Sequence, residues 1–250
     1  MCSHYQTEKR RKQIEKLFRI KLPLDWEAPP GGLHIYPTQF APIIRRPAER
    51  DAGDEAVPDF ELVEARFGLL PSFARDEKFG LKTYNARSET AATLPSFRVA
   101  WEKARHCIVP CQAIYEPDWR TGTHVPTRFT AANDETLGVA GLWQPWKSPR
   151  GDWVATFTML TVNADDHDLM KHFHRPDAKR PLDQQDKRMV VVLPEDAYEA
   201  WLDAPPQRSI DFMRQYPANR LIATPEQPPP RTAKPAVLKA SVPPTQALLF

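Results

Sequence analysis

The segments LGVAGLWQ, residues 137–144, and WVATFTMLTV, residues 153–162, decide the fold class of this chain. Both are rich in β-branched and aromatic residues, and the segment between them contains Pro and Gly, so each is predicted to be a strand. Four further segments have the same character: HCIVP at 106–110, QAIYE at 112–116, TRFTA at 127–131 and RMVVVL at 188–193. Because no crossover helix joins neighbouring strands, we expect mostly antiparallel pairing. The predicted class is α+β with a substantial sheet core.

Helical patterns are few and flank these strands. One is predicted over residues 7–18, with Ile14, Leu17 and Phe18 on one side of a charged segment. A second is PSFRVAWEKA at 95–104, where Ser96 can cap the helix and apolar residues follow at helical spacing. A third is LPEDAYEAWLD at 193–203, whose predicted buried face is Tyr198, Trp201 and Leu202.

The composition is that of an ordinary globular protein. Of 250 residues, 41% are hydrophobic, and 34 Lys and Arg against 32 Asp and Glu leave a net charge of +2, so an anionic partner must be attracted by a local patch. No run approaches the roughly 18 apolar residues of a membrane span. Three cysteines and a start without a signal-peptide pattern favour a reducing cytoplasm and no contact with a membrane.

Two segments lack any period that would bury a face. RDAGDEAVPD at 50–59 is predicted to be a surface loop, and the proline-rich sequence from Thr224 onward is predicted to be a mobile tail. We therefore expect a folded domain over residues 1–222 and a tail over 223–250. As an alternative, the last residues, 247–250, dock on the domain as an apolar plug.

Cys2 becomes the first residue if Met1 is removed, which a small second residue permits. The chain then carries an amine and a thiol on neighbouring carbons. The α-amine has a reference pKa of about 7.7–8.0, so part of it is unprotonated at neutral pH and can attack an aldehyde. The thiol can then close a five-membered thiazolidine ring in an intramolecular step. The alternative is that Cys2 merely follows the initiator and has no role.

The segment TYNARSET, residues 83–90, places Asn85, Arg87 and Glu89 at alternate positions. In an extended chain these side chains project to one side, where an amide and a guanidinium suit the recognition of sugar and phosphate. The alternative is an edge strand with a solvated polar face.

Two further positions suit proton transfer. Glu116 ends the apolar segment QAIYE, and partial burial there is expected to raise its pKa toward a useful value. Residues 169–189 contain His172 and His174, and between Lys171 and Arg188 six basic residues stand against three acidic ones. Such a segment suits an anionic backbone and a histidine acid or base. The alternatives are a glutamate at the rim of a strand and a charged loop with an incidental histidine pair.

Metal and cofactor motifs are not found. His106, Cys107 and Cys111 lack the spacing of a zinc knuckle, and the segment between them looks like strand core. Serine hydrolase, P-loop and dinucleotide motifs are absent. We expect neither a metal nor another cofactor.

Motifs spread along the chain together resemble the SRAP family, the SOS-response-associated peptidase-like proteins that cross-link to abasic sites. The motifs are Cys2, RFGLLPSFARD (66–76), YNARSET (84–90), PSFRVAWEKARHCIVPCQAIYEP (95–117), LTVNA (160–164), FHRP (173–176) and KRMVVVLPEDAYEAWL (187–202). The resemblance covers residues 1–222 with the order of motifs intact. Separated motifs in one order are more specific than any single motif, so the functional interpretations are favoured.

The resemblance implies a mixed α/β, barrel-like domain that binds single-stranded DNA and captures the aldehyde of an abasic site in a thiazolidine, which shields the lesion in the DNA damage response. Cys2 resembles the family's nucleophile, and Asn85 the residue that orients the amino end and the sugar. Glu116 resembles the proton shuttle, and His174 the histidine that assists ring opening and reversal. The same site is implied in an autopeptidase that removes residue 1. The DNA contacts that we expect are Arg87, Glu89, Phe67, His4, Arg175 and Arg188.

The chain departs from the family pattern at several positions. Ser3-His4-Tyr5 stand where Gly-Arg is common, so an arginine contact to phosphate is missing or replaced by His4. Phe67 stands in place of a usual Trp and keeps an apolar wedge. The chain between His174 and Arg188 is longer than in the family, so His172 remains a competitor for the histidine role.

We therefore expect an enzyme with SRAP-type cysteine autopeptidase and abasic-site cross-linking, lyase-like activity. Its expected partner is single-stranded DNA that contains abasic sites, and we expect a monomer that is cytoplasmic and associated with the nucleoid when bound to DNA. Two alternatives stay open. One is a thiol peptidase that acts on protein substrates, and the other is a noncovalent single-stranded DNA-binding module.

Overall fold

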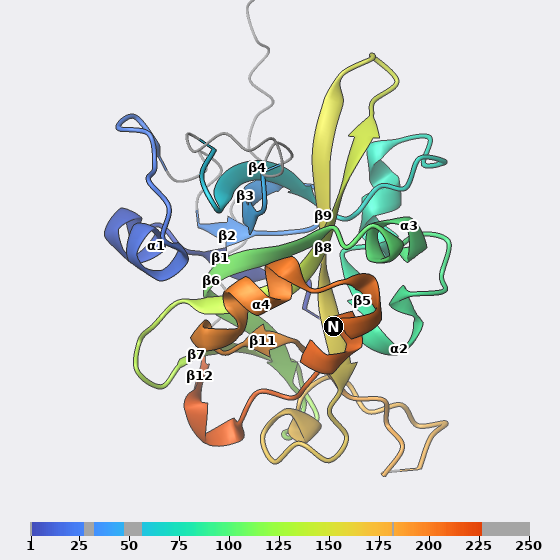
Figure 1. The fold of residues 1–250 in the computed structure, drawn as a ribbon. Coiled ribbons are helices and arrows are strands. Elements are labelled where there is room, and N and C mark those ends of the chain that lie inside the picture. Colours follow the sequence, from blue (N-terminus) through green and yellow to red (C-terminus); the bar gives the residue numbers. More distant parts are fainter. Residues whose placement is uncertain (1, 28–32, 48–56, 182, 227–250) are drawn as a thin grey trace, which may run out of the picture.

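The computed structural model describes residues 2–27, 33–47, 57–181 and 183–226. Within these residues, twelve strands form one sheet, and short helices lie around it (Figure 1). The strands are β1 (Tyr5–Thr7), β2 (His34–Ile35), β3 (Phe40–Arg45), β4 (Glu61–Phe67), β5 (Asn85–Arg87), β6 (His106–Asp118), β7 (Val125–Ala131), β8 (Leu137–Lys147), β9 (Trp153–Asn163), β10 (Arg188–Val190), β11 (Val192–Leu193) and β12 (Leu221–Pro225).

The helices of the described residues are short. The α-helices are α1 (Arg11–Phe18), α2 (Ser88–Ala91), α3 (Arg98–Glu102) and α4 (Tyr198–Asp203). The 3₁₀ helices are η2 (Glu77–Lys82), η3 (Met170–His172), η4 (Glu195–Ala197), η5 (Pro206–Phe212) and η6 (Ala218–Arg220). None of these helices has the length and apolar content that a membrane-spanning helix requires.

The sheet closes on itself through five of its strands. Starting from β8, each strand pairs with the next in the order β9, β4, β3 and β6, and β6 pairs back with β8. Nearly all pairings are antiparallel, and β4 and β5 each pair with β9 in parallel. The expected class, α+β with a mostly antiparallel, barrel-like sheet core, is confirmed.

The core of the barrel explains why the long strands are almost continuously apolar. β6, β8 and β9 are buried along most of their lengths, since they face the barrel interior on one side and helices or other strands on the other. α4 packs on this surface, where the Trp201 indole donates a hydrogen bond to the backbone oxygen of Cys107 at 2.9 Å. A β-carbon at Gly138 would overlap the ring of Tyr198, so a glycine is required where this helix meets β8.

The sequence predictions differ from the structure mainly at element ends. Residues 106–110 and 112–116 form one strand, β6, and the helix predicted from residue 7 begins at Arg11 because residues 5–7 pair with β6. Ser96 does not cap α3, which has no side-chain cap and ends at Glu102. The predicted face of α4, by contrast, is buried.

Two predictions concern the ends and loops of the domain. The last strand, β12, pairs with β7 as far as Pro225, three residues beyond the domain boundary at 222 that we expected. Most of the predicted tail, residues 227–250, lies outside the described residues, and so does most of the loop predicted at 50–59.

Candidate active site

Cys2 lies just before β1 in the interior of the protein. Its side chain is fully buried, and its Sγ donates a hydrogen bond to the backbone oxygen of His4 at 3.4 Å. The same oxygen accepts a hydrogen bond from the N–H of Tyr115 at 3.0 Å, which ties the amino-terminal segment to β6. Burial and, to a lesser extent, the negative charge of Glu116 raise the pKa of the Cys2 thiol to about 12. The thiol is therefore protonated at neutral pH.

Glu116 forms a buried pair with His174. The Nε2 atom of His174 lies 2.7 Å from Oε2 of Glu116, and the two side chains are 15% and 2% exposed. Burial by itself raises the pKa of Glu116, but nearby positive charges, foremost that of His174, together with its hydrogen bond to His174 outweigh burial and lower that pKa overall. The predicted direction of the shift was wrong, because the sequence does not show that a cation lies against the carboxylate. At neutral pH Glu116 is an ionised hydrogen-bond acceptor.

The backbone around His174 explains how residues 58 positions apart meet. The N–H of His174 donates to the backbone oxygen of Pro117 at 2.8 Å, and Phe173 forms a bridge with Asp118, so this segment pairs with the end of β6. His174 has a left-handed backbone with φ of 63°. Its Nδ1 atom is buried and has no hydrogen-bond partner among the described residues. His172 is exposed at the end of η3, so the structure places His174, and not His172, against Glu116.

β5 lies beside this pair. Asn85 is 9% exposed, its Nδ2 atom donates to the backbone oxygen of Tyr84 at 3.0 Å, and its Oδ1 atom has no partner among the described residues. Burial first, and then the charges of Glu116 and Cys2, raise the pKa of Tyr84. The phenol of Tyr84 thus belongs to the same site. In the sequence Tyr84 falls within a family motif but carries no signal of a role, because a tyrosine beside a strand is usually core.

A cavity of about 320 Å³ gives access to the pair. Its lining comes from the amino-terminal segment, β2, β6, β7 and the segment after η3. The lining residues are Ser3, His4, His34, Tyr36, Tyr115, Glu116, Pro117, His124, Pro126, His174 and Glu226. Cys2 immediately precedes Ser3, which lines the cavity, and the charge of Glu116 acts on the Cys2 thiol. The cavity, the carboxylate, the histidine and the thiol therefore form one candidate site.

His4 forms one wall of this cavity as a neutral aromatic ring. It is stacked between Tyr36 and Tyr115, with ring centroids at 4.4 Å and 4.0 Å, and its Nε2 atom lies 2.8 Å from Nδ1 of His34. Burial and, second, the neighbouring His34 lower the pKa of His4 to about 4. His4 therefore does not replace an arginine as a cation at neutral pH. The sequence gives no signal of this stack, because its members lie on three separate segments.

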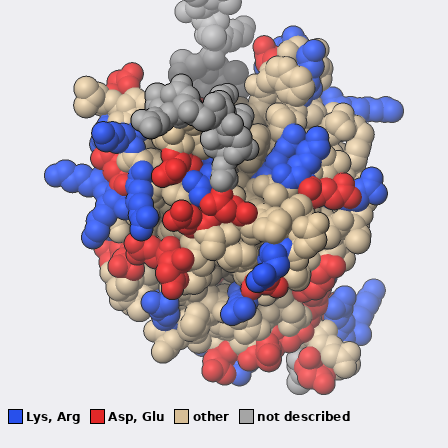
Figure 2. Space-filling view, in the orientation of Figure 1, with Lys and Arg blue, Asp and Glu red and all other residues tan. Residues whose placement is uncertain are grey.

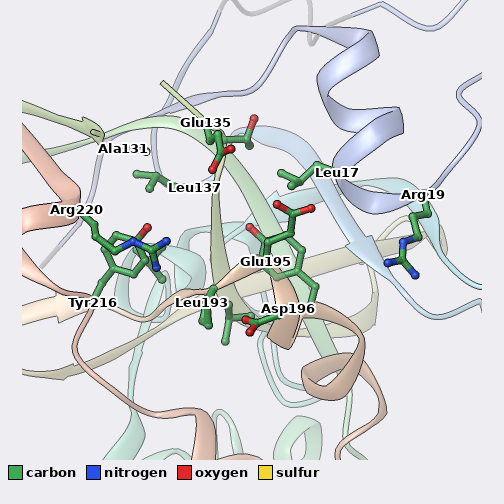
Figure 3. A pocket seen from close by; sticks show the side chains of 14 residues that line it. Leu17, Arg19, Ala131, Glu135, Leu137, Leu193, Glu195, Asp196, Tyr216 and Arg220 are labelled. Carbon is green, nitrogen blue, oxygen red and sulfur yellow. The ribbon is translucent and has the colours of Figure 1, made fainter. Parts of the chain in front are cut away.

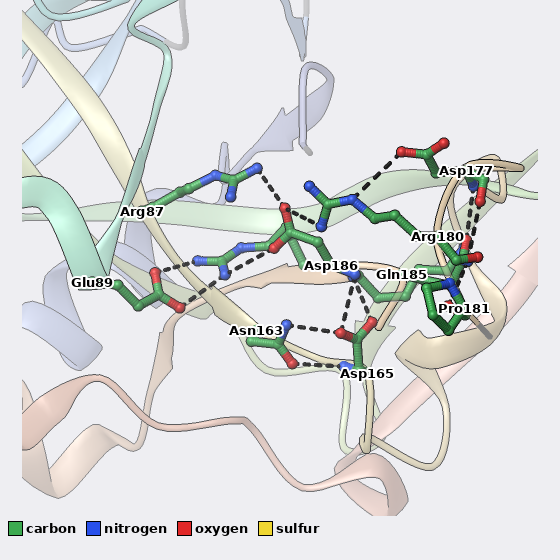
Figure 4. Close-up of polar contacts among 11 residues, drawn as sticks. Arg87, Glu89, Asn163, Asp165, Asp177, Arg180, Pro181, Gln185 and Asp186 are labelled. Atoms are coloured by element: carbon green, nitrogen blue, oxygen red, sulfur yellow. Dashed lines mark hydrogen bonds and ion pairs between the residues drawn. The ribbon is translucent and has the colours of Figure 1, made fainter. Parts of the chain in front are cut away.

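The residues that we expected to contact DNA divide into paired and open side chains, and Figure 4 shows Arg87 and Glu89 with the groups that they contact. Only Asn85 and Arg87 alternate on a strand, because the chain turns into α2 at Ser88; the expectation that Glu89 shares their extended face was wrong. Glu89 instead accepts two hydrogen bonds of 2.8 Å from Arg188, whose side chain is 4% exposed. Arg87 is 46% exposed and lies 2.7 Å from Asp186.

Arg175 and Phe67, two other expected DNA contacts, differ in their exposure to solvent. Arg175 is exposed, and its guanidinium lies 5.5 Å from the ring centroid of Trp119. Phe67 is fully buried and packs on Phe157 and Tyr5 in the core, so its ring is not available to stack on a base. The interpretation of Phe67 as a wedge that contacts DNA was wrong, because its strand faces the barrel interior.

A larger cavity of about 490 Å³ lies elsewhere, between α1, η4, η6 and the ends of β7, β8 and β11 (Figure 3). Three carboxylates line it, those of Glu135, Glu195 and Asp196, but neither Cys2 nor the pair of Glu116 and His174 does. No group of three or more His, Cys, Asp or Glu side chains in the described part of the chain is arranged to hold a metal ion. The smaller cavity is lined by the pair of Glu116 and His174 and by Ser3, the residue next to Cys2.

Known proteins similar to this chain share its sequence and its fold. The chain is 32% identical over 156 residues to the abasic site processing protein YoqW of Bacillus subtilis, which covers 61% of this chain and 62% of that protein. It is 26% identical over 220 residues to the mouse abasic site processing protein HMCES, which covers 74% of this chain and 57% of that one. The chain thus matches about three fifths of the length of these curated relatives.

Solved structures extend the similarity over most of the chain. A crystal structure of a Bordetella bronchiseptica protein is 43% identical, has a TM-score of 0.76, and covers 90% of this chain and 100% of that one. A Bacteroides thetaiotaomicron protein with 19% identity shares the fold, with a TM-score of 0.68 over 90% of this chain and 92% of that one. The model of the family described as SOS response associated peptidase (SRAP) matches residues 1–227. The chain therefore belongs to the SRAP family.

Proposed function

We propose that this protein processes abasic sites in single-stranded DNA by forming a covalent thiazolidine between Cys2 and the aldehyde of the opened deoxyribose. The observation that carries the proposal is the buried pair of Glu116 and His174 at a cavity beside an amino-terminal thiol. Membership of the SRAP family and the names of the Bacillus and mouse relatives support the same substrate.

The reaction begins once Met1 has been removed and Cys2 carries the free α-amine. The amine nitrogen attacks C1′ of the aldehyde and gives a carbinolamine. Protonation of the carbinolamine oxygen releases water and leaves an iminium ion, and His174 is the group placed to supply this proton. Glu116, ionised and hydrogen-bonded to His174, can carry the proton that the amine loses to the alkoxide oxygen of the carbinolamine, and is then free to accept another.

Ring closure uses the thiol of the same residue. Because the pKa of the Cys2 thiol is about 12, the sulfur must lose its proton as it adds to the iminium carbon, and Glu116 is the nearby carboxylate that can take it. The new C–S bond completes a ring of the sulfur, the α-nitrogen, two carbons of Cys2 and C1′. The sum of the steps joins one aldehyde to one aminothiol and releases one water.

Asn85 and Tyr84 position the reacting groups. The buried Oδ1 atom of Asn85 has no partner among the described residues and is free to accept a hydrogen bond from the α-amine or a sugar hydroxyl. Opening of the closed deoxyribose ring needs an acid near the ring oxygen, and the unpartnered Nδ1 of His174 suits this role when it carries a proton. Reversal of the cross-link runs through the same groups in the opposite order.

Noncovalent contact with DNA rests on exposed cations near the cavity. Arg87 and Arg175 are the expected backbone contacts that remain exposed, and Tyr36, 43% exposed at the cavity wall, offers a ring face to a neighbouring base. The strength of such contacts depends on charge and on stacking, and not on the base sequence of the DNA. In this role the protein acts as a monomer on DNA in the cytoplasm.

A second candidate function is proteolysis by the same site. Autoproteolytic removal of Met1 needs only one turnover on the chain itself, and the family's description as a peptidase favours it. Cleavage of other proteins is less favoured, because thiol peptidases rely on a thiolate, and burial raises the pKa of this thiol far above neutral pH.

Intact-mass spectrometry after incubation with an oligonucleotide that contains one abasic site tests the proposal. The expected product lacks Met1 and carries the oligonucleotide with the loss of one water. Protein without Met1 that leaves the abasic oligonucleotide unmodified contradicts the covalent function, and cleavage of added peptides in the same sample would favour the peptidase instead.

A further inference from the structure

Three arginines converge on one carboxylate beside the candidate active site (Figure 4). Asp186 lies 2.7 Å from Arg87, 3.5 Å from Arg188 and 3.7 Å from Arg180. We call these four residues the Asp186 cluster. The Asp186 side chain is 19% exposed, whereas Arg87 and Arg180 are 46% and 49% exposed. Two guanidinium groups are therefore open to solvent while both pair with the same acidic group.

The Asp186 cluster is joined to the active site on two sides. Arg87 follows Asn85 by two residues on β5, so their backbones are roughly 7 Å apart along the strand and their side chains leave the same face. Lys187, next to Asp186, donates a hydrogen bond from Nζ to the backbone oxygen of His174 at 2.9 Å. A DNA strand with its abasic sugar at the cavity therefore brings a nearby phosphate within reach of this cluster.

Arg188 and Glu89 form the fixed base of the cluster. Arg188 is held by two hydrogen bonds from its guanidinium to Glu89 and by a further one of 2.9 Å to the backbone oxygen of Thr161. Its side chain is almost completely buried. Arg188 and Glu89 thus set the position of the neighbouring groups, and the exposed Arg87 and Arg180 remain for a ligand.

A phosphodiester and a carboxylate present the same chemistry to arginine. Each carries one negative charge on two oxygens, which the guanidinium fork binds in a similar geometry. Arg87 is one of the DNA contacts that the family resemblance implies. We propose that Arg180 joins it in binding one DNA backbone phosphate, and that Asp186 occupies this site in the free protein and competes with the phosphate. The proposal rests on the proposed function for the identity of its ligand, DNA.

Overall charge does not account for DNA binding in this protein. The net charge is +2, and the face in Figure 2 shows acidic and basic side chains intermixed. Attraction of a polyanion therefore depends on which individual arginines are free to bind a phosphate. At this site Asp186 pairs with both exposed arginines, and Arg180 also lies 3.5 Å from Asp177.

The position of Asp186 does not depend on its own carboxylate. Asp165 accepts hydrogen bonds from the backbone N–H groups of Asp186 at 3.0 Å and Lys187 at 2.7 Å, and Asn163 in turn holds Asp165. Asp186 has φ of 58°, in the left-handed region that Asn tolerates as well as Asp. Asp186→Asn therefore removes the charge and keeps the backbone in place.

The test measures the affinity of Cys2→Ala protein for a fluorescent oligothymidylate without abasic sites, by anisotropy across a range of salt concentrations. Asp186→Asn in this background is expected to bind about 2- to 10-fold more tightly at low salt, since an exposed ion pair no longer has to be broken. Arg180→Gln is expected to bind more weakly. The matched control is Asp183→Asn, which makes the same change in net charge in the same segment at an exposed residue outside the cluster.

A multiple-mutant comparison decides whether the gain acts through the two exposed arginines. In a background with both Arg87→Gln and Arg180→Gln the effect of Asp186→Asn should fall to that of Asp183→Asn. A gain for Asp186→Asn that exceeds the control and disappears in this background supports the competition. Equal gains for both aspartate variants, no gain, or a gain that persists without both arginines overturns it.

The result does not depend on the covalent chemistry. The probe has no aldehyde and the protein has no Cys2, so the phosphate site can be supported while wild-type protein forms no adduct with abasic DNA. That combination contradicts the proposed cross-link and leaves the phosphate site in place. Adduct formation by wild-type protein with no selective effect of Asp186→Asn supports the cross-link and overturns the phosphate site.

Discussion

Two ion pairs of equal length lie in very different surroundings in this molecule. Nε2 of His174 is 2.7 Å from Glu116, and a guanidinium nitrogen of Arg87 is 2.7 Å from Asp186. The first pair is buried, with side chains 15% and 2% exposed, and the second is 46% and 19% exposed. Water screens the exposed pair, and the buried pair is protected from it.

The difference in burial separates proton transfer from ligand binding. In the buried pair each charge acts on its neighbours: the charge of Glu116 adds to burial in raising the pKa of Cys2, and the charge of His174 helps to lower the pKa of Glu116 against burial. In the exposed pair the mutual attraction is weak enough for another anion to replace the carboxylate. Changes at the first pair should alter the rate of adduct formation, and changes at the second should alter DNA affinity.

Loss of the nucleophile should have the largest effect. Cys2→Ala is expected to abolish the adduct with abasic single-stranded DNA, while noncovalent affinity changes by less than about 2-fold, because the side chain is buried and is not exposed to the DNA backbone. Gel analysis under denaturing conditions and anisotropy measure the two quantities. Cys111→Ala, which removes another fully buried thiol, is the control and should keep the adduct. An adduct that persists in Cys2→Ala would show that the thiol is not required and that an amine alone, the α-amine or a lysine, holds the DNA.

The next effect should come from the buried pair. Glu116→Gln keeps the size of the side chain and removes its charge, so we expect adduct formation to slow by roughly 10²-fold to 10⁴-fold, the range of lost general acid–base catalysis. Single-turnover rates at saturating DNA report this step. Noncovalent affinity should stay within about 2-fold of the wild type. A rate equal to that of the wild type at several pH values would remove Glu116 from the mechanism.

A smaller effect, on binding and not on rate, should follow from the exposed pair. Arg87→Gln is expected to weaken binding of abasic-free single-stranded DNA by about 10-fold and to reduce the slope of log affinity against log salt by about 0.7, as expected for one lost phosphate contact. The adduct rate at saturating DNA should be unchanged. If that rate falls as far as in Glu116→Gln, the division between the two pairs fails.

The smallest effect concerns the stacked His4. Its pKa of about 4 lies below the ordinary value near 6.5, so the unfolded chain binds the additional proton between these values and stability should rise with pH across this window. After allowance for its partial exposure, we expect a gain of about 1 kcal/mol from about pH 4.5 to about pH 7. His4→Phe keeps a ring in the stack and should lose this part of the pH dependence in urea unfolding. Identical pH profiles of the free energy of unfolding in the two proteins would show that burial of His4 does not make stability depend on pH.

Much of the fold was predictable because its long elements carry their own pattern. β8 and β9 are long apolar segments rich in β-branched residues, and this pattern predicts strands. The buried face of α4 follows from the helical spacing of Tyr198, Trp201 and Leu202. β1, β2 and β5 have two or three residues each, too few for any period. They exist because a long neighbour offers unpaired backbone groups, which the local sequence does not reveal.

The candidate site was predictable in its residues and not in its electrostatics. The sequence motifs indicate Glu116 and His174, and the structure brings them into contact. The sign of the Glu116 pKa shift and the neutral state of His4 both depend on neighbours distant in sequence, namely His174 and His34. The alternation of Asn85, Arg87 and Glu89 failed at its last member because α2 begins at Ser88.

By itself the sequence determined the family, the sheet-rich class and the residue types available for chemistry, since motif order and hydrophobic periodicity are local properties of a chain. The tertiary structure alone decided which charges are buried and which are open. Burial is set by contacts between segments far apart, such as β6 with the residues after η3, and burial determines whether an ion pair moves protons or exchanges for a ligand.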